Sequence, residues 1–131
     1  MRSFLTLVLF MSATAVADTT IIDRTGSWDV NMPLGPSRSL EFTTDEGTWM
    51  NLDVSPDNQT IVFDMLGDIY SMPMEGGEAK VLRSGLAWEV QARFSPDGKQ
   101  ILFTSDAGGG DNIWVMNTDG SNARQITKED F

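Results

Sequence analysis

One stretch of this chain occurs twice. Ser55-Pro56-Asp57 returns as Ser95-Pro96-Asp97, and the apolar triplet Ile61-Val62-Phe63 returns as Ile101-Leu102-Phe103, in both cases 40 residues later. A fixed spacing between two similar segments is the mark of a structural repeat. It limits the chain to folds that are built from adjacent copies of one unit.

The second copy contains four extra residues, and all of them lie in one place. Asp68-Ile69-Tyr70 corresponds to Asn112-Ile113-Trp114 at a spacing of 44, and the added residues are Ala107-Gly108-Gly109-Gly110. The same spacing relates Lys80-Val81-Leu82 to Arg124-Gln125-Ile126. An insertion limited to one glycine-rich loop indicates two copies of one folded unit.

Each copy predicts four short strands. Alternating apolar and polar residues predict the first strand, and the continuous apolar triplet predicts a second strand that is covered on both faces. The third strand is also apolar, whereas the fourth is more polar, as expected for an outer edge near solvent. We expect these strands at 50–54, 61–63, 69–72 and 79–82 in the first copy, and at 90–94, 101–103, 113–116 and 123–126 in the second.

The repeated Ser-Pro-Asp motif predicts a tight turn rather than a ligand site. Proline fixes φ at the first corner of a turn, and aspartate bonds back to a nearby amide. The next residue is Asn58 in the first copy and Gly98 in the second. Glycine and asparagine are the residues that best tolerate a positive φ, so the exchange preserves the backbone while it changes the side chain.

Four antiparallel strands in a unit of about 40 residues are the pattern of a β-propeller blade. The sequence therefore predicts an all-β propeller segment with one blade at 49–87, a second at 88–127 and the start of a further blade at 128–131. Because propellers close with about four to eight blades, we expect an N-terminal fragment of a longer protein. Two blades alone would expose an apolar face, so we expect marginal stability or aggregation.

Residues 1–17 predict a secretory signal peptide. Arg2 precedes an apolar run at 4–11, and Ala15-Val16-Ala17 forms a small-residue cleavage pattern. The run is too short to span a bilayer, so we expect cleavage, export to a bacterial periplasm and no membrane insertion afterwards. No cysteine follows the run, so a lipid anchor is not expected. Residues 18–48 predict an extended lead-in, which includes a possible ring-closing strand at 39–43.

Charge and composition exclude several functions. The 9 Lys and Arg are outnumbered by 19 Asp and Glu, so the formal net charge is −10 and we expect no nucleic-acid binding. The sequence contains no Cys and no His. This absence excludes thiol nucleophiles, Ser-His-Asp catalysis and metal sites built from imidazole or thiolate. We expect no catalytic residue, metal or cofactor in this segment.

Several motifs of the second copy resemble a known repeat. The turn at 95–99, the strand at 112–117, the Asp119-Gly120 pair and the segment 124–127 together look like the TolB-like, WD-repeat-like propeller unit. The first copy departs from that unit at Asn58, at Gln59 and in its shorter loop. The resemblance implies a propeller in an exported protein, and it says little about activity because folds of this kind have many functions.

A longer resemblance runs from about Trp28 to Phe131. The segments 46–57, 63–70, 84–90 and 104–112 look like the start of large exported bacterial amidohydrolases. Those proteins place a TolB-like propeller before a metal-dependent hydrolase domain, in which most of the metal ligands are histidines. The resemblance implies that a divalent metal and catalysis belong to a C-terminal domain, and that this domain is the partner of the propeller.

The polar positions of the two first strands are the candidate functional residues. Asn51 and Asp53 correspond to Gln91 and Arg93, and the first strand of a propeller blade borders the central channel. We predict that these four side chains line a tunnel that admits or filters substrate, and that Asp53 and Arg93 lie close enough to pair. Channel-side solvation or a contact between blades is the alternative interpretation.

Two acidic loops and four aromatic residues have structural interpretations. The loops at 106–112 and 117–122 lack the spacing of a phosphate loop or an EF-hand, so we expect connections between strands. The aromatic residues recur at equivalent or nearly equivalent positions. This recurrence favours packing between blades over carbohydrate binding for Trp49, Tyr70, Trp88 and Trp114.

Three functions remain open from the sequence. The segment is a scaffold or substrate gate in an amidohydrolase-like enzyme, a non-catalytic TolB-type propeller that binds protein or peptide ligands, or the propeller of a tricorn-like or prolyl-oligopeptidase-like serine peptidase. The longer resemblance favours the first. An HxH motif in the full-length protein would indicate the first function, an end after the last blade the second, and a GxSxG elbow the third.

Overall fold

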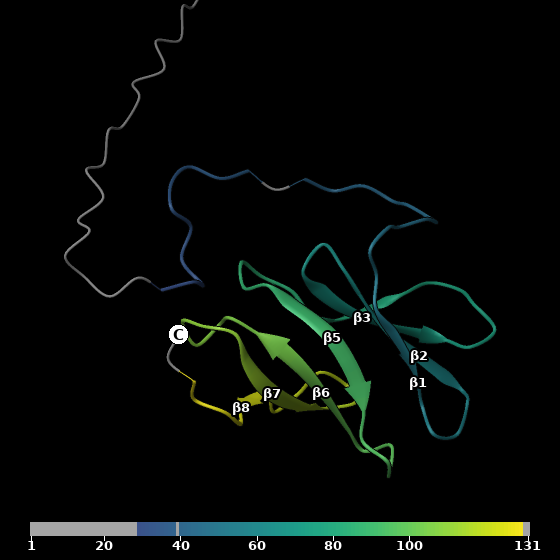
Figure 1. Ribbon diagram of the computed structural model, residues 1–131. Helices are drawn as coiled ribbons and strands as arrows, with labels where there is room; N and C mark the ends of the chain where they lie inside the picture. The colour runs from purple at the N-terminus through teal and green to yellow at the C-terminus, as the bar shows by residue number, and fades with distance from the viewer. Residues whose placement is uncertain (1–28, 39, 130–131) are drawn as a thin grey trace, which may run out of the picture.

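The computed structural model describes residues 29–38 and 40–129 (Figure 1). The predicted signal peptide, the first part of the lead-in, Ser39 and the last two residues lie outside these ranges. Within them, no helix has the length and apolar character needed to cross a membrane.

The described residues form two four-stranded antiparallel sheets, and the strands of each sheet follow one another in chain order. All eight predicted strands are present and the described part contains no helix, so the all-β prediction is confirmed. We call the first sheet blade 1 and the second blade 2. Blade 1 consists of β1 (Leu52–Val54), β2 (Thr60–Met65), β3 (Asp68–Pro73) and β4 (Lys80–Arg83), and blade 2 of β5 (Glu89–Phe94), β6 (Gln100–Ser105), β7 (Asn112–Asn117) and β8 (Arg124–Gln125).

The pairing of the strands preserves the repeat. Phe63 lies opposite Tyr70 in blade 1, and Phe103 lies opposite Trp114 in blade 2. The edge strands β4 and β8 are the ones whose polarity predicted an edge position. The two acidic loops connect β6 to β7 and β7 to β8, as expected from their sequence.

The Ser-Pro-Asp motifs form the predicted turns. In blade 1, the Ser55 hydroxyl donates to the Asp57 carboxylate and accepts the backbone N–H of Thr60 at 2.9 Å. Asn58 has a φ of 57° and donates its N–H to the Ser55 carbonyl at 2.8 Å. Gly98 has a φ of 68° at the equivalent position of blade 2. The left-handed conformation explains why the two copies use asparagine and glycine here.

Hydrogen bonds in these turns lower the pKa of the exposed aspartates. The Ser55 hydroxyl and then the backbone N–H of Gln59 hold the pKa of Asp57 below its ordinary value of 3.8. Ser95 and Lys99 act on the pKa of Asp97 in the same way. A lowered pKa in the folded state means that the contribution to stability is present above pH 3.8 and is lost as the pH falls through the folded pKa.

The hydrophobic core lies between the two blades. Strand β5 of blade 2 packs against β1 and β2 of blade 1. The two facing surfaces bring together apolar side chains that are almost fully removed from water, which is the main stabilising contribution in a fold of this type. Blade 1 supplies Val62, Ile69 and Leu82, exposed by 0%, 0% and 9%, and blade 2 supplies Ala92, Ile101, Phe103 and Met116, exposed by 1% or less.

The other face of blade 2 is open. It carries the repeat equivalents of the three core residues of blade 1. These are Leu102, Ile113 and Ile126, which are exposed by 41%, 38% and 49%. The prediction that the apolar triplet is covered on both faces is confirmed for the face of each strand that lies in the core between the blades, where Val62 and Ile101 are fully buried. No sheet of the described part lies on the other face of β2 or β6, so cover on that face stays a prediction. The expected exposure of an apolar blade face is confirmed.

The lead-in follows one end of both blades. Its described part, residues 29–38 and 40–48, runs above the two sheets without forming a helix or strand (blue in Figure 1). Asn31 donates its side-chain amide to the Ala107 carbonyl of blade 2 at 3.2 Å. Residues 40–43 pair with no strand in the described ranges. A ring-closing role for this segment requires a last blade and stays a prediction.

Two of the four aromatic residues pack inside their own blades. The Tyr70 ring stacks on Phe63 with a centroid distance of 5.6 Å, on the face of blade 1 that points away from blade 2. Trp114 lies tilted against Phe103 at 6.4 Å and packs on the core between the blades. Packing between blades is therefore confirmed for Trp114. It stays a prediction for Tyr70, because no blade of the described part lies on that face of blade 1.

The other two aromatic residues lie at the end of the blades that the lead-in follows. Trp88 lies on Gly67, where an added Cβ would come within 2.7 Å of the indole ring, yet 56% of Trp88 remains exposed. Trp49 is 98% exposed and has a φ of 60°. The expected packing is partly right for Trp88 and wrong for Trp49, because the left-handed backbone directs the Trp49 side chain into solvent.

Gly98 tests the conformational explanation of the turn. Gly98→Ala is expected to destabilise the chain by about 1–2 kcal/mol, because a Cβ is disfavoured in the left-handed region. The nearest atom to that Cβ would be a Pro56 carbon at 3.5 Å, an ordinary contact, so the cost comes from the backbone. Urea unfolding followed by circular dichroism measures the loss. Gly98→Asn, which copies blade 1, is expected to cost less, and equal losses would contradict the explanation.

Candidate functional site

The four candidate residues lie at the seam between the blades. Asn51 lies just before β1 and Asp53 lies in it, whereas Gln91 and Arg93 are in β5. Because β5 packs against β1, the fold brings the four residues together at one seam, as the repeat predicted. Asn51 and Asp53 are half-buried, and Gln91 and Arg93 are exposed.

A buried carboxylate holds this seam. Asp64 in β2 is 3% exposed. It accepts the backbone N–H of Asn51 at 3.2 Å, the side-chain amide of Asn51 at 3.1 Å and the backbone N–H of Gln91 at 2.7 Å. Gln91 has a φ of 58° within an irregular part of the β5–β6 pairing, and its N–H is directed at blade 1. Asp64 therefore fixes a bulge in one blade against the first strand of the other.

Asp53 and Arg93 cross the seam in opposite directions without pairing. The Asp53 carboxylate accepts the backbone N–H of Phe94 at 2.8 Å. The Arg93 guanidinium donates to the Leu52 carbonyl at 3.2 Å and to the Ala92 carbonyl at 2.8 Å. The expected Asp53–Arg93 pair is therefore wrong, because both side chains bind backbone groups instead. These contacts join blades, and a tunnel-lining role stays a prediction because it requires the complete ring.

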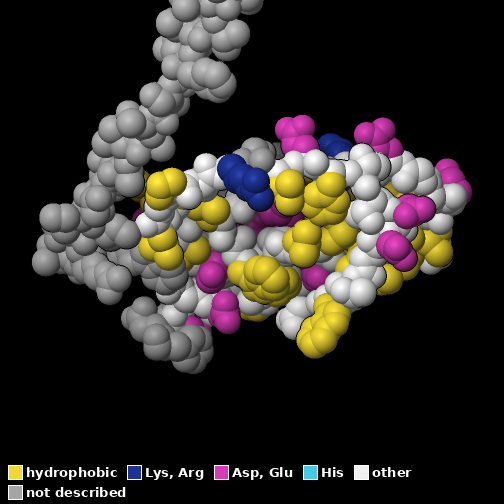
Figure 2. Space-filling model, turned by 90° about the horizontal axis from the view of Figure 1, so that it is seen from above, with side chains coloured by type: hydrophobic (Ala, Val, Ile, Leu, Met, Phe, Trp, Pro, Cys, Tyr) yellow, Lys and Arg dark blue, Asp and Glu magenta, His cyan; other side chains and the backbone are white. Residues whose placement is uncertain are grey.

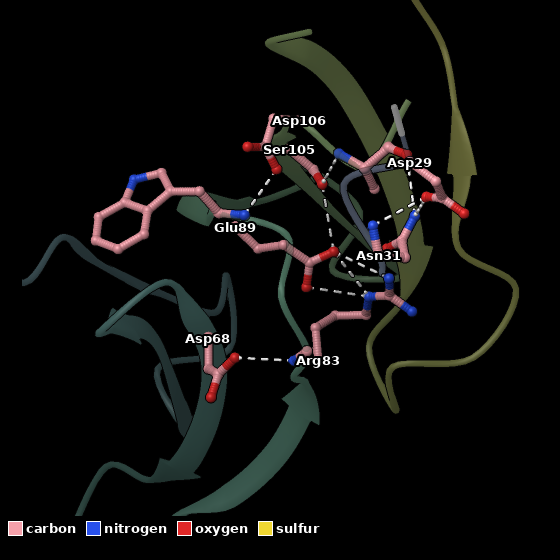
Figure 3. A network of polar contacts seen from close by, with 10 residues as sticks. Asp29, Asn31, Asp68, Arg83, Glu89, Ser105 and Asp106 are labelled. Atoms are coloured by element: carbon pink, nitrogen blue, oxygen red, sulfur yellow. Dashed lines mark hydrogen bonds and ion pairs between the residues drawn. The ribbon is translucent and has the colours of Figure 1, made fainter. Parts of the chain in front are cut away.

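One ion pair is present among the described residues, and it links the two ends of the loop that connects blade 1 to blade 2 (Figure 3). Arg83 is the last residue of β4 and Glu89 is the first residue of β5. The Arg83 guanidinium donates to the Glu89 carboxylate through Nη2 at 2.9 Å and through Nε at 3.2 Å. Glu89 is 2% exposed and also accepts the Ser105 hydroxyl at 3.4 Å. The ion pair thus joins β4, β5 and β6.

Two aspartates hold the loop between Arg83 and Glu89. Asp68 accepts the backbone N–H of Gly85 at 3.2 Å, and Asp106 accepts the backbone N–H of Trp88 at 2.7 Å. Blade 2 repeats the first of these contacts. Asn112, the equivalent of Asp68, accepts the backbone N–H of Glu129 at 2.8 Å. The chain therefore leaves both blades under the same local restraint.

Exposed apolar side chains gather at the end of the blades where this loop lies. We call them the end surface, and Figure 2 looks down on this end, where apolar side chains lie among acidic ones and few basic ones. Two members have left-handed backbones, Trp49 at a φ of 60° and Leu66 at a φ of 57°. The end surface consists of Trp49, Leu66, Leu86 and Trp88, exposed by 98%, 73%, 54% and 56%.

The acidic side chains of the described residues do not gather into a cluster of the kind that holds a metal ion. The described ranges contain no group of three or more Asp, Glu, His or Cys side chains arranged to hold one. The buried acidic side chains already have partners, since Asp64 accepts amide N–H groups and Glu89 accepts a guanidinium. The polar chemistry of the described part therefore positions backbone and joins blades.

Sequence reasoning missed Asp64, Arg83 and Glu89. Asp64 directly follows the apolar triplet, and Thr104 stands at its place in the second copy. A charged residue in a strand of otherwise buried residues was the available signal, because such residues are rarely buried without a partner. Arg83 and Glu89 gave no comparable signal, since each lies at a strand end where charge is common.

Comparison with known proteins agrees with this geometry. No protein-family model matches the chain. An uncharacterized protein of Agrobacterium fabrum is 35% identical over 77 residues, which are 56% of this chain and 26% of that protein. The Tol-Pal system protein TolB of Anaeromyxobacter dehalogenans is 47% identical over 36 residues, which are 28% of this chain and 8% of that protein.

Two solved structures extend the comparison to the fold. The putative TolB from Agrobacterium tumefaciens superimposes with a TM-score of 0.59 at 29% identity, over 64% of this chain and 32% of that chain. TolB from Acinetobacter baumannii gives a TM-score of 0.57 at 28% identity, over 66% of this chain and 23% of that chain. This chain thus spans about a quarter of the first curated relative and a third or less of the solved structures.

Two antiparallel sheets in chain order, joined face to face through one core, define a β-propeller segment. Its blades are TolB-like, in sequence as well as in structure.

Asp64→Asn tests the role of the buried carboxylate. We expect a loss of about 1.5–3 kcal/mol in the free energy of unfolding, because two backbone N–H groups lose a charged acceptor. Hydrogen exchange is expected to become faster at the amides of Asn51 and Gln91, and to change less at the amides of β2. Asp53→Asn, at a half-buried position with one such contact, serves as the control and is expected to cost less.

The two partners of the ion pair are expected to differ in how much their removal destabilises the chain. Arg83→Met leaves the Glu89 carboxylate buried with a hydroxyl as its remaining side-chain partner, so we expect a loss of about 3 kcal/mol. Glu89→Gln is expected to cost less, since the Arg83 side chain is 31% exposed and can turn to water. Urea unfolding measures both variants. The exposed Arg124→Met is the control, with a change within about 0.5 kcal/mol.

Proposed function

We propose that this chain is a non-catalytic, TolB-type propeller segment of an exported periplasmic protein, and that its end surface binds a protein partner. The similarity to TolB proteins supports both the type of propeller and the proposal of export. The polar residues of the described part support a non-catalytic role, because those that are buried serve the joining of the blades. The four side chains of the end surface are each more than half exposed, so they are available to an external partner.

The observation that carries this proposal is the conformation of Trp49 and Leu66. Both have bulky side chains and a positive φ, which costs roughly 1–2 kcal/mol per residue. Both are exposed, by 98% and 73%, so packing inside the chain does not offset that cost. Strained positions of this kind cluster at binding sites, where the strain holds a side chain in the orientation that a partner needs.

The surroundings of the end surface define the chemistry of the partner. Leu66 and Trp88 lie together, because Trp88 packs on the glycine that follows Leu66. The carboxylates of Asp68 and Asp106 bind the loop at the same end, and the whole chain is strongly acidic. The partner that fits is a protein with an apolar anchor and basic neighbours, since charge complementarity favours that combination.

Leu66→Asn tests the proposal on the chain alone. Position 66 is the first corner of the two-residue β2–β3 turn, where asparagine is preferred over leucine. We expect Leu66→Asn to raise the free energy of unfolding by about 1 kcal/mol while it weakens partner binding. Leu86→Asn, in the same surface but without a left-handed backbone, is the control and is expected to bring no gain in stability.

The partner itself is found by crosslinking in the periplasm. A photoreactive amino acid at position 66 is expected to crosslink one protein, and the same group at Met74, on the turn at the other end of blade 1, is expected to crosslink none. The identified protein is then purified, and Trp88→Ala is expected to weaken its binding by at least about 30-fold, the scale of a buried tryptophan anchor. An unchanged affinity would exclude the end surface as the binding site.

A second candidate is the scaffold or gate of an amidohydrolase-like enzyme. The segments that begin at Glu46, Phe63 and Ser84 favour it through their resemblance to those enzymes. The mass and sequence of the native exported protein separate the candidates. A further domain with an HxH motif and metal-dependent hydrolysis would support the enzyme, a GxSxG elbow would support a serine peptidase, and propeller sequence alone would support the binding protein.

A further inference from the structure

Trp88 of the end surface is restrained from both blades, although 56% of it is exposed. It stands directly before β5, the first strand of blade 2, and its indole ring lies on Gly67 in the β2–β3 turn of blade 1. The backbone N–H of the next residue, Glu89, donates to the Gly67 carbonyl at 2.8 Å. Only glycine allows this close approach, because an added Cβ would come within 2.7 Å of a ring carbon of Trp88.

Asp106 restrains Trp88 from the side of blade 2. It directly follows β6, and its carboxylate accepts the Trp88 N–H at 2.7 Å (Figure 3). Hydrogen bonds to an ionised carboxylate are about twice as strong as those between neutral groups. Two consecutive N–H groups, those of Trp88 and Glu89, are therefore bound to different blades, and this arrangement fixes the direction in which the tryptophan leaves the loop.

The place of Asp106 comes from the four-residue insertion of blade 2. In blade 1 the equivalent position is Leu66, in a turn of two residues, whereas blade 2 has six residues between β6 and β7. The longer loop begins with a turn, in which the Gly109 N–H donates to the Asp106 carbonyl at 2.8 Å. The two copies thus differ at this end, because one presents an exposed leucine and the other an acceptor that reaches back to its own first strand.

Nothing else in the described part engages the Asp106 carboxylate. The residue is half-buried, and among the described residues its carboxylate accepts the Trp88 N–H and no other hydrogen bond. Trp88 does not belong to the hydrophobic core between the blades. The bond therefore orders a side chain that is directed toward solvent. A residue that is ordered beforehand avoids the loss of affinity that ordering at an interface causes.

We propose that Asp106 is a positioning residue of the end surface, which holds Trp88 in the orientation in which Trp88 meets the partner. This inference rests on the proposed function for the role of the surface, whereas the restraint on Trp88 is a property of the chain alone. Asp106 acts through the place of its acceptor oxygen and not through its charge.

The restraint is measured on the full chain without a partner. Fluorinated tryptophan gives each indole its own NMR signal, and Trp88→Phe assigns that of Trp88. Asp106→Ala is expected to shift the Trp88 signal and to speed hydrogen exchange of its amide by about tenfold, while the signal of Trp114 stays unchanged. Asp106→Asn retains an acceptor oxygen at the same place and is expected to keep exchange within about threefold.

The effect on binding is measured with the protein that position 66 crosslinks. Asp106→Ala is expected to weaken its binding by about fivefold to tenfold, and Asp106→Asn by less than about threefold. In the Trp88→Ala background, Asp106→Ala is expected to add nothing, because no tryptophan is left to position. Asp97→Ala is the control. It removes a carboxylate that also accepts a backbone N–H, from Lys99, but in a turn at the other end of the blade, and it is expected to leave binding unchanged.

Asp106→Glu covers the case in which the alanine variant does not fold. Glutamate keeps the charge but displaces the acceptor by one methylene group. It is therefore expected to loosen Trp88 and to weaken binding more than Asp106→Asn does. Circular dichroism of all variants checks that the two sheets are intact.

The possible failures are distinguishable. An unchanged Trp88 signal and amide exchange in the folded alanine or glutamate variant would overturn the inference without any partner. Equal losses of affinity for Asp106→Asn and Asp106→Ala, with full affinity for Asp106→Glu, would overturn it in favour of a charge effect. An unchanged affinity of Trp88→Ala would overturn the proposed function and with it the role of Asp106 in binding, even where the free chain shows the restraint on Trp88.

Discussion

The rest of this structure depends on one constraint, which is that a single four-stranded sheet has two apolar faces and can cover neither of them. Blade 1 solves half of this problem by placing Val62, Ile69 and Leu82 against blade 2. The free energy gained there comes from apolar area removed from water. Polar contacts then define where the sheets meet. Asp64 and Asp53 accept backbone N–H groups of β5, so directional hydrogen bonds set the relative position of the blades. The buried apolar area provides most of the free energy that holds the blades together.

The loop that connects the two blades is held by a buried ion pair and by hydrogen bonds from its backbone to aspartates. Glu89 is removed from water and would be unfavourable without Arg83, since an unpaired buried carboxylate loses its hydration. The pair joins the last residue of one blade to the first residue of the next, and it therefore restricts the loop at both ends. Where blade 2 ends, Thr127 stands in place of Arg83, and its hydroxyl donates to Asn112 at 2.8 Å. The end of blade 2 thus keeps the restraint on the backbone without an ion pair at this position.

The sequence predicted most of the fold because the fold is local and repeated. Strand alternation, the Ser-Pro-Asp turns and the spacings of 40 and 44 were sufficient to place all eight strands. The site was harder to predict for a physical reason. Asp64 acts on residues 13 and 27 positions away, and spacing along the chain does not show which amides a carboxylate reaches. Asp53 and Arg93 were placed at the correct seam, but charge alone did not reveal that backbone groups would bind them first. Trp49 was misjudged because its left-handed backbone leaves no trace in the residue pattern.

The contact between Asn112 and the Glu129 amide has a consequence for how the molecule is curved. The same kind of contact, from Asp68 to the Gly85 amide, precedes the turn into blade 2. If every step between blades is set by a side chain and an amide of one repeat, the angle between successive blades is a property of the repeat itself. The diameter of the ring then follows from a single angle, added once per blade, and a difference of a few degrees in that angle changes the number of blades at which the two ends meet.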